Sequence, residues 1–162
     1  MDVLKIVRDG AMLSLAACAF ILLTLRLNPR IWLQDYPKDI QSMVPPKTGR
    51  EKILSAILGL LFLLLLLAVP IVSTMQARQR FGGESPFLIL AGHAFGVVFL
   101  FNLADWLILD CLVFCRITPA FVVIPGSEGA SGYKDYGFHF RGFLKGTAFS
   151  VVAALFISGI VG

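Results

Sequence analysis

The chain contains four apolar stretches that are each long enough to cross a lipid bilayer, and this feature restricts the fold more than any other. A hydrocarbon core about 30 Å thick takes roughly twenty residues of α-helix. The sequence therefore predicts an all-α protein, a four-transmembrane-helix bundle that forms a single membrane domain over residues 1–162. The predicted spans cover residues 10–27, 53–77, 86–115 and 142–161.

The composition also indicates a lipid environment. Hydrophobic residues make up 57% of the chain and charged residues only 15%, whereas soluble domains have about 25% charged residues. The net charge of +4 does not indicate nucleic-acid binding, because the Lys and Arg residues lie in the connections and form no basic stripe interleaved with aromatic residues. The predicted partner is the lipid bilayer.

Two long connections, residues 28–52 and 116–141, are predicted to lie on one side of the membrane, at its interface. Ten of the 14 Lys and Arg residues lie in or beside these loops. Because basic residues favour the cytoplasmic side, we expect both loops in the cytoplasm and both termini outside, in a multi-pass protein of the inner (plasma) membrane. Residues 10–27 also resemble a signal peptide, but Arg26 follows without a small-x-small site, so we expect this segment to remain as a helix.

Small side chains predict which helices pack together. The third span contains Gly92-x-x-x-Gly96, and such faces let helices approach closely where lipid supplies no hydrophobic drive. Spans 86–115 and 142–161 are therefore expected to pack tightly, and the same faces would suit a second copy of the chain or a membrane partner protein. The ladder along the last span consists of Gly146, Ser150, Ala154, Ser158 and Gly162.

Two spans are preceded by residues typical of helix starts. Thr48 and Glu51 have the spacing of a capping box. Ser85-Pro86 combines a good N-cap with proline at the first helical position.

The third span carries four polar side chains, His93, Asn102, Asp105 and Asp110. In an α-helix, Asp105 and Asp110 would lie about 140° apart around the axis, so these carboxylates are not expected to act as a pair. The simplest hypothesis pairs each with an arginine at the same end of the bundle, because carboxylates near a bilayer seldom stay unpaired. The candidate arginines are Arg26, Arg30, Arg116 and Arg141.

His93 is expected to form an interhelical hydrogen bond with Ser158. A proton-relay or metal role has less support, because no second intramembrane His or Glu accompanies it. Cys18, Cys111 and Cys115 are interpreted as packing residues rather than disulfide partners. No metal site and no cofactor is predicted.

The two loops mix aromatic and charged residues, unlike a flexible linker. Ile31, Trp32, Leu33 and Tyr36 are expected to lie in the lipid headgroup layer. Acid–base or metal chemistry would require polar groups from both loops to converge with the third span. The candidate polar site comprises Asn102, Asp105, Asp110, Asp35, Tyr36, Asp39, Tyr133, Asp135, Tyr136, His139 and Arg141, and no catalytic role is assigned to any of them.

Three segments resemble small bacterial integral membrane proteins that cross the membrane four times: NPRIWLQDYPKDIQ, FNLADWLILD, and PGSEG followed by YKDYGFHFRGFLKG. The resemblance covers most of the chain. It implies the fold and no particular activity.

Three functional hypotheses follow, and whether the protein is an enzyme stays open. The first is a structural or interaction component of the membrane, which rests on the small-residue ladders and the charges at the membrane edge. The second is a binding or catalytic site for a lipid headgroup or amphipathic metabolite at the cytoplasmic face. The third is a small transporter or channel component, for which only Asn102 and His93 could line a path.

Overall fold

The computed structural model describes residues 2–80 and 86–162, and within these residues the chain is helical with no strand. Four helical segments there are long and apolar enough to span a membrane, which confirms the predicted all-α bundle. They are α1 (Val3–Leu27), α3 (Gly49–Arg80), α4 (Phe87–Ala104) continued by η2 (Asp105–Ile117), and α5 (Tyr136–Val161).

Two helices begin earlier than the apolar stretches predict, because capping carboxylates start them. Asp2 accepts a hydrogen bond from the backbone N–H of Lys5 at 3.0 Å, so the basic N-terminal segment belongs to α1. Asp135 accepts one from the backbone N–H of Phe138 at 2.8 Å and starts α5. In both cases one charged side chain satisfies a backbone donor that the first helical turn leaves free.

The capping box before α3 is confirmed. The backbone N–H of Glu51 donates to Thr48 Oγ1 at 3.2 Å, and the backbone N–H of Thr48 donates to the Glu51 carboxylate at 2.8 Å. The same carboxylate pairs with Arg30 Nε at 2.7 Å, which ties the start of α3 to the first loop. The helix start predicted at Ser85 lies outside the described residues.

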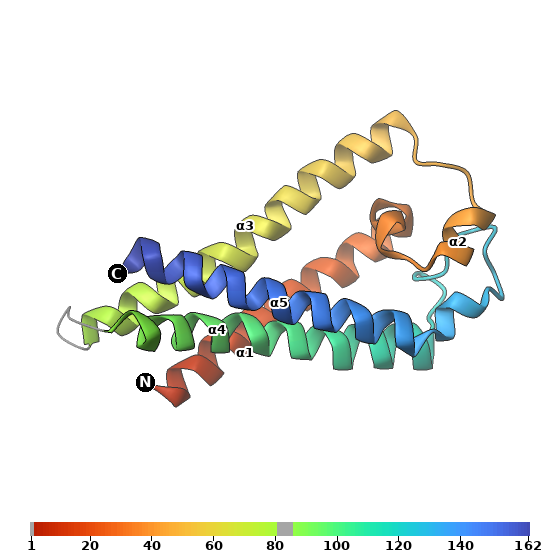
Figure 1. Ribbon diagram of the computed structural model, residues 1–162. Coiled ribbons are helices and arrows are strands. Elements are labelled where there is room, and N and C mark those ends of the chain that lie inside the picture. The colour runs from red at the N-terminus through yellow and green to blue at the C-terminus, as the bar shows by residue number, and fades with distance from the viewer. Residues whose placement is uncertain (1, 81–85) are drawn as a thin grey trace.

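Both loops lie at one end of the bundle, and both termini lie at the other (Figure 1). We call the former, with residues 28–48 and 118–135, the loop end. The loops contain η1 (Pro29–Asp35), α2 (Lys38–Met43) and η3 (Ser131–Lys134). They bond directly to each other, because Tyr36 Oη donates to the backbone oxygen of Val122 at 2.8 Å and the backbone N–H of Gly132 donates to Asp39 at 2.7 Å.

The loops have a hydrophobic core of their own, and three of the four residues expected in the headgroup layer are instead buried in the protein, with Trp32 packed against that core. Ile31, Leu33 and Tyr36 are buried within the protein, and Val122 and Ile124 are fully buried. Burial of these side chains against one another offsets the conformational entropy that two long connections lose on folding. The loop end is therefore a packed layer of protein.

The predicted close packing of the third and fourth spans is present between α4 and α5. The two helices lie side by side along the bundle (Figure 1), and Leu90, Ala94, Ala154 and Ile157 form their shared core. The role of Gly96 differs from the expectation, because it faces Ile6 of α1 rather than α5. The small residues of α4 thus serve two interfaces.

Helix α3 is inclined to the rest of the bundle. Near its C-terminal end it meets α5, where Arg78 donates to the backbone oxygen of Val161 at 2.7 Å. Towards the loop end α3 leans away from α5 (Figure 1). The two helices are therefore joined at the end with the termini and apart at the other.

We expect Gly146→Ala to destabilise the bundle. A Cβ atom at this position would lie 2.0 Å from Asn102 Oδ1 on α4, and relief of such overpacking typically costs about 1–3 kcal/mol. Thermal unfolding in mild detergent measures the effect. Gly142→Ala on the same helix is the matched control, since its Cβ would meet nothing within 4 Å, and an equal loss in both variants would contradict the packing described here.

Candidate functional site

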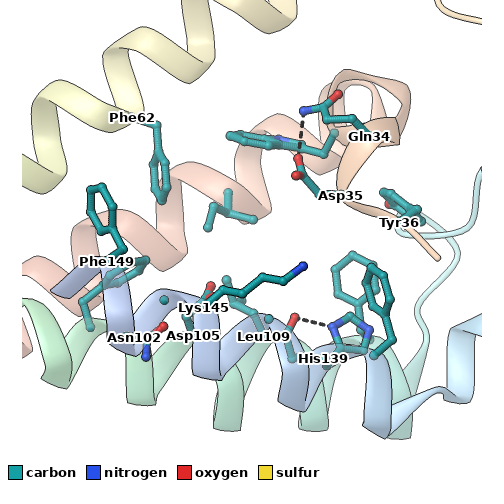
Figure 2. Close-up of a pocket in the computed structure, with 18 of the residues that line it drawn as sticks. Gln34, Asp35, Tyr36, Phe62, Asn102, Asp105, Leu109, His139, Lys145 and Phe149 are labelled. Carbon is teal, nitrogen blue, oxygen red and sulfur yellow. Dashed lines mark hydrogen bonds and ion pairs between the residues drawn. The ribbon is translucent and has the colours of Figure 1, made fainter. Parts of the chain in front are cut away.

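A cavity of about 730 Å³ lies between α1, α3, α5 and the third span, and the first loop covers its loop end. We call it the loop-end cavity. Figure 2 shows Phe62 and Phe149 at one end of it and Asp35, Tyr36 and His139 at the other. Its apolar lining includes Leu25, Phe62, Leu66, Phe101 and Phe149. Its polar lining consists of Gln34, Asp35, Lys38, Gln41, Asn102, Asp105, Asp110, His139 and Lys145, with the rings of Trp32 and Tyr36.

Asp105 and Asp110 both line the cavity, and the sequence prediction that they face apart is wrong. The reason is the helix type, since Asp105–Ile117 is a π-helix. At its end the backbone N–H of Thr118 donates to the backbone oxygen of Val113, five residues earlier, at 2.8 Å. Where hydrogen bonds join residues five apart, side chains five apart lie closer together around the axis than they do in an α-helix. The angle calculated for an α-helix does not apply.

Asp110 pairs with a histidine rather than an arginine. Its Oδ1 lies 2.8 Å from His139 Nδ1 on α5. The imidazole is buried against the rings of Phe114 and Phe138, with centroids 5.6 and 5.4 Å away. His139 Nε2 is buried and has no hydrogen-bond partner among the described residues. In a neutral imidazole whose Nδ1–H donates to Asp110, Nε2 is an acceptor.

Within the described residues, Asp105 pairs with none of the four arginines that the sequence suggested. Among the residues that the structure describes, its half-buried carboxyl group takes part in no hydrogen bond or ion pair. The candidate Arg30 pairs with Glu51, and Arg141 lies 4.0 Å from Asp135. A carboxyl group at this depth without a protein partner is energetically costly and marks a functional site by default.

Asn102 is held on its donor side. Its Nδ2 donates to the backbone oxygen of Phe143 and to Thr147 Oγ1, each at 3.1 Å. These bonds fix the amide between α4 and α5 at the point where Gly146 provides the space. Asn102 therefore joins the two helices as well as lining the cavity.

Asp35 and Tyr36 bring the first loop to the cavity. Gln34 Nε2 donates to Asp35 Oδ2 at 2.8 Å. Burial raises the pKa of Asp35 above its ordinary value, and the hydrogen bond from Gln34 and the charge of Lys47 oppose this shift without cancelling it. Burial also raises the pKa of the Tyr36 hydroxyl, which is bonded to the second loop. Asp35 lines the loop-end cavity, whereas the hydroxyl of Tyr36 bonds the first loop to the second.

Five predicted site residues do not line the cavity: Asp39, Tyr133, Asp135, Tyr136 and Arg141. Asp39 accepts from Gly132, and Tyr133 Oη bonds to Ser127 and to the backbone N–H of Ile124 at 2.8 and 2.9 Å. Asp135 caps α5, and Tyr136 and Arg141 are exposed. These residues belong to the loop end or flank it, and they do not line the loop-end cavity.

Lys145, Lys38, Gln34 and Gln41 line the cavity although sequence reasoning did not select them. A signal for Lys145 was present, because it lies next to the face of α5 that carries His139, Gly142, Gly146 and Phe149 at helical spacing. The glutamines and Lys38 belong to a loop whose path no periodicity predicts.

His93 lies outside the cavity, in a separate buried network near the end with the termini. Ser73 Oγ donates to Asp9 Oδ2 at 2.7 Å and lies 2.8 Å from His93 Nε2. Asp9 also pairs with Lys5 Nζ at 2.6 Å. An interhelical bond of His93 is thus confirmed, but the predicted partner is wrong, since Ser158 donates to its own helix at Ala154. Lys5 and Asp9 were missed because α1 begins earlier than predicted, and Ser73 was missed although it lies within the predicted second span.

The cysteines are free, and among the described residues no three His, Cys, Asp or Glu side chains are placed to hold one metal ion together. No protein-family model, no curated protein and no solved structure matches the chain. The function therefore has to be inferred from the loop-end cavity and the side chains around it.

We expect Asp9→Asn to destabilise the protein by about 3 kcal/mol, since removal of one partner leaves a buried charge uncompensated. The side chain of Lys5 is only 1% exposed. Arg8→Gln is the control, because Arg8 contacts the same carboxylate at 2.8 Å from an exposed position and exposed pairs contribute at most about 1 kcal/mol. Thermal unfolding in detergent compares them, and similar losses would show that the buried pair has no special role.

Proposed function

We propose that the protein binds an amphipathic molecule of the membrane in the loop-end cavity, with its chain in the apolar part and its head group among the polar side chains. The observation that carries the proposal is the unpartnered Asp105 in a cavity that is lined by both apolar and polar side chains. Ligand cavities have volumes of about 300–1,000 Å³, are mostly apolar, and contain a few placed polar groups. The volume of about 730 Å³ agrees with this.

The arrangement of α3 and α5 supports entry from the lipid. Both helices have the composition of membrane spans, and they separate towards the loop end (Figure 1). Phe62 and Leu66 of α3 and Phe149 of α5 line the cavity between them. An acyl chain that enters there exchanges one apolar environment for another, so it stays buried while the head group reaches the polar side chains.

A purely structural role, the first hypothesis from the sequence, gives no account of Asp105. A residue that only stabilises the bundle is expected to pair with another polar group, as Asn102 and Asp110 do. A transport path has less support for a different reason. Val97 lies between His93 and Asn102 on α4 and is fully buried against Leu13 and Ala17, so the two polar groups belong to separate sites.

We further propose that the loop end faces the cytoplasm in the inner membrane, as the excess of Lys and Arg in the loops indicates. Single cysteines are placed at Ser42 and Ser131, which are both exposed. They are expected to react with a membrane-impermeant thiol reagent only after the cells are opened. The background is a chain whose own three cysteines are replaced by serine. Labelling of both positions in intact cells would show that the loop end lies outside the cell, opposite to the proposed orientation.

Native mass spectrometry of gently extracted protein tests the binding proposal. Wild-type protein is expected to retain a lipid, and Leu66→Trp is expected to lose most of it, because the indole occupies the apolar part of the cavity. Leu64→Trp is the matched control on the same helix, since Leu64 is exposed. Thermal unfolding verifies that both variants fold. Recovery of wild-type protein as the bare polypeptide, even after incubation with lipid, would refute the proposal.

A further inference from the structure

We infer that the head group bound in the loop-end cavity carries a primary ammonium group that pairs with Asp105. This inference rests on the function proposed above and identifies the chemical class of the ligand. The inference rests on two hydrogen-bond acceptors in the polar lining of the cavity that have no donor among the described residues. The lysines that line the cavity do not donate to them.

The first acceptor is Asp105. Its carboxyl group lines the cavity and has no hydrogen bond or ion pair within the described part of the chain. Asp110 lines the same cavity because the π-helix brings it to the same side, so two carboxyl groups face one space. Like charges that face one cavity disfavour each other, and a cation between them relieves the repulsion.

The second acceptor is His139 Nε2. The residue is 6% exposed and lines the cavity, yet its Nε2 has no partner among the described residues. Asp110 fixes the ring by accepting from Nδ1 at 2.8 Å, which leaves Nε2 as an acceptor in the neutral ring. Unpaired buried acceptors of this kind are rare in folded proteins, and a donor on the bound molecule would satisfy this one.

The lysines of the cavity do not meet these needs. Figure 2 shows the side chain of Lys145 extended across the cavity, with its ammonium group directed away from Asp105 and towards the loop end. No ion pair joins Lys145 or Lys38 to a carboxylate among the described residues. Both cations are placed in the polar part of the cavity, where they suit a phosphate.

A primary ammonium fits the acceptors better than a quaternary one, because it supplies three N–H donors whereas a quaternary ammonium supplies none. Two kinds of amphiphile carry this group. In an ethanolamine phospholipid the amine accompanies a phosphate that Lys145 and Lys38 could bind. In a long-chain amine the ammonium is the whole head group, and the lysines would play no part.

Native mass spectrometry with lipids of identical dioleoyl chains tests the inference on the full chain in mild detergent. The ethanolamine lipid is expected to bind about tenfold more tightly than the choline and glycerol lipids, a factor equivalent to about 1.4 kcal/mol. Asp105→Asn is expected to bring these ratios close to one while lipid is still bound. Glu128→Gln, which removes an exposed carboxylate outside the cavity, is expected to leave them unchanged.

A second measurement covers the case in which Asp105→Asn does not fold. N-acetylation of the ethanolamine lipid removes the charge from the ligand, so wild-type protein should bind the acetylated lipid no better than the glycerol lipid. Competition with dodecylamine then separates the two sources. Displacement at equal concentration indicates that the amine suffices, and weak displacement indicates that the phosphate contributes, and both results support the ammonium.

The outcomes distinguish the inference from the proposed function. Equal binding of the three lipids by wild-type protein, or a preference that N-acetylation leaves intact, would overturn the ammonium and leave the binding site in place. Absence of bound lipid in every arm, with normal thermal unfolding, would overturn the proposed function and the inference together.

Discussion

Within a lipid bilayer a polar side chain finds almost no water, so it is stable only when another polar group of the protein or of a ligand meets it. This constraint explains most of the interior of the bundle. Asn102 is matched by Thr147, and the acids Asp9 and Asp110 by Lys5 and His139. Each of these contacts joins two helices or two turns of one helix. The polar contacts therefore fix the relative positions of the helices, which apolar packing alone would leave variable.

In the loop-end cavity this matching is incomplete at Asp105 and at His139 Nε2, within the part of the chain that the structure describes. Two features of the chain produce it together. The inclination of α3 separates it from α5 near the loops, and the π-helix turns Asp105 and Asp110 to the same side. A π-helix gives up favourable packing along its axis, and such segments are frequent at functional sites. Its presence where the unpartnered groups gather agrees with a site maintained for a ligand.

The number of spans, their approximate bounds and the shared end of the two loops were predictable, because lipid as a solvent permits few folds for so apolar a chain. The arrangement of the polar residues was less so. An α-helix and a π-helix suit the same apolar composition, so the residue pattern does not indicate that Asp105 and Asp110 line one cavity. Asp39 and Tyr133 were selected for the candidate polar site, but they bond within the loops and do not line the cavity.

The buried pair of Lys5 and Asp9 affects how the chain is assembled. Both residues lie on α1, whereas Ser73 and Gln76, which complete their hydrogen bonds, follow 64 and 71 residues later. Until α3 is in place, the Lys5–Asp9 pair lacks the hydrogen bonds to Ser73 and Gln76, and water has to supply them at the membrane surface. Full insertion of α1 is therefore coupled to the arrival of α3, and the Lys5–Asp9 pair gains its remaining partners only after residue 76 has been synthesised.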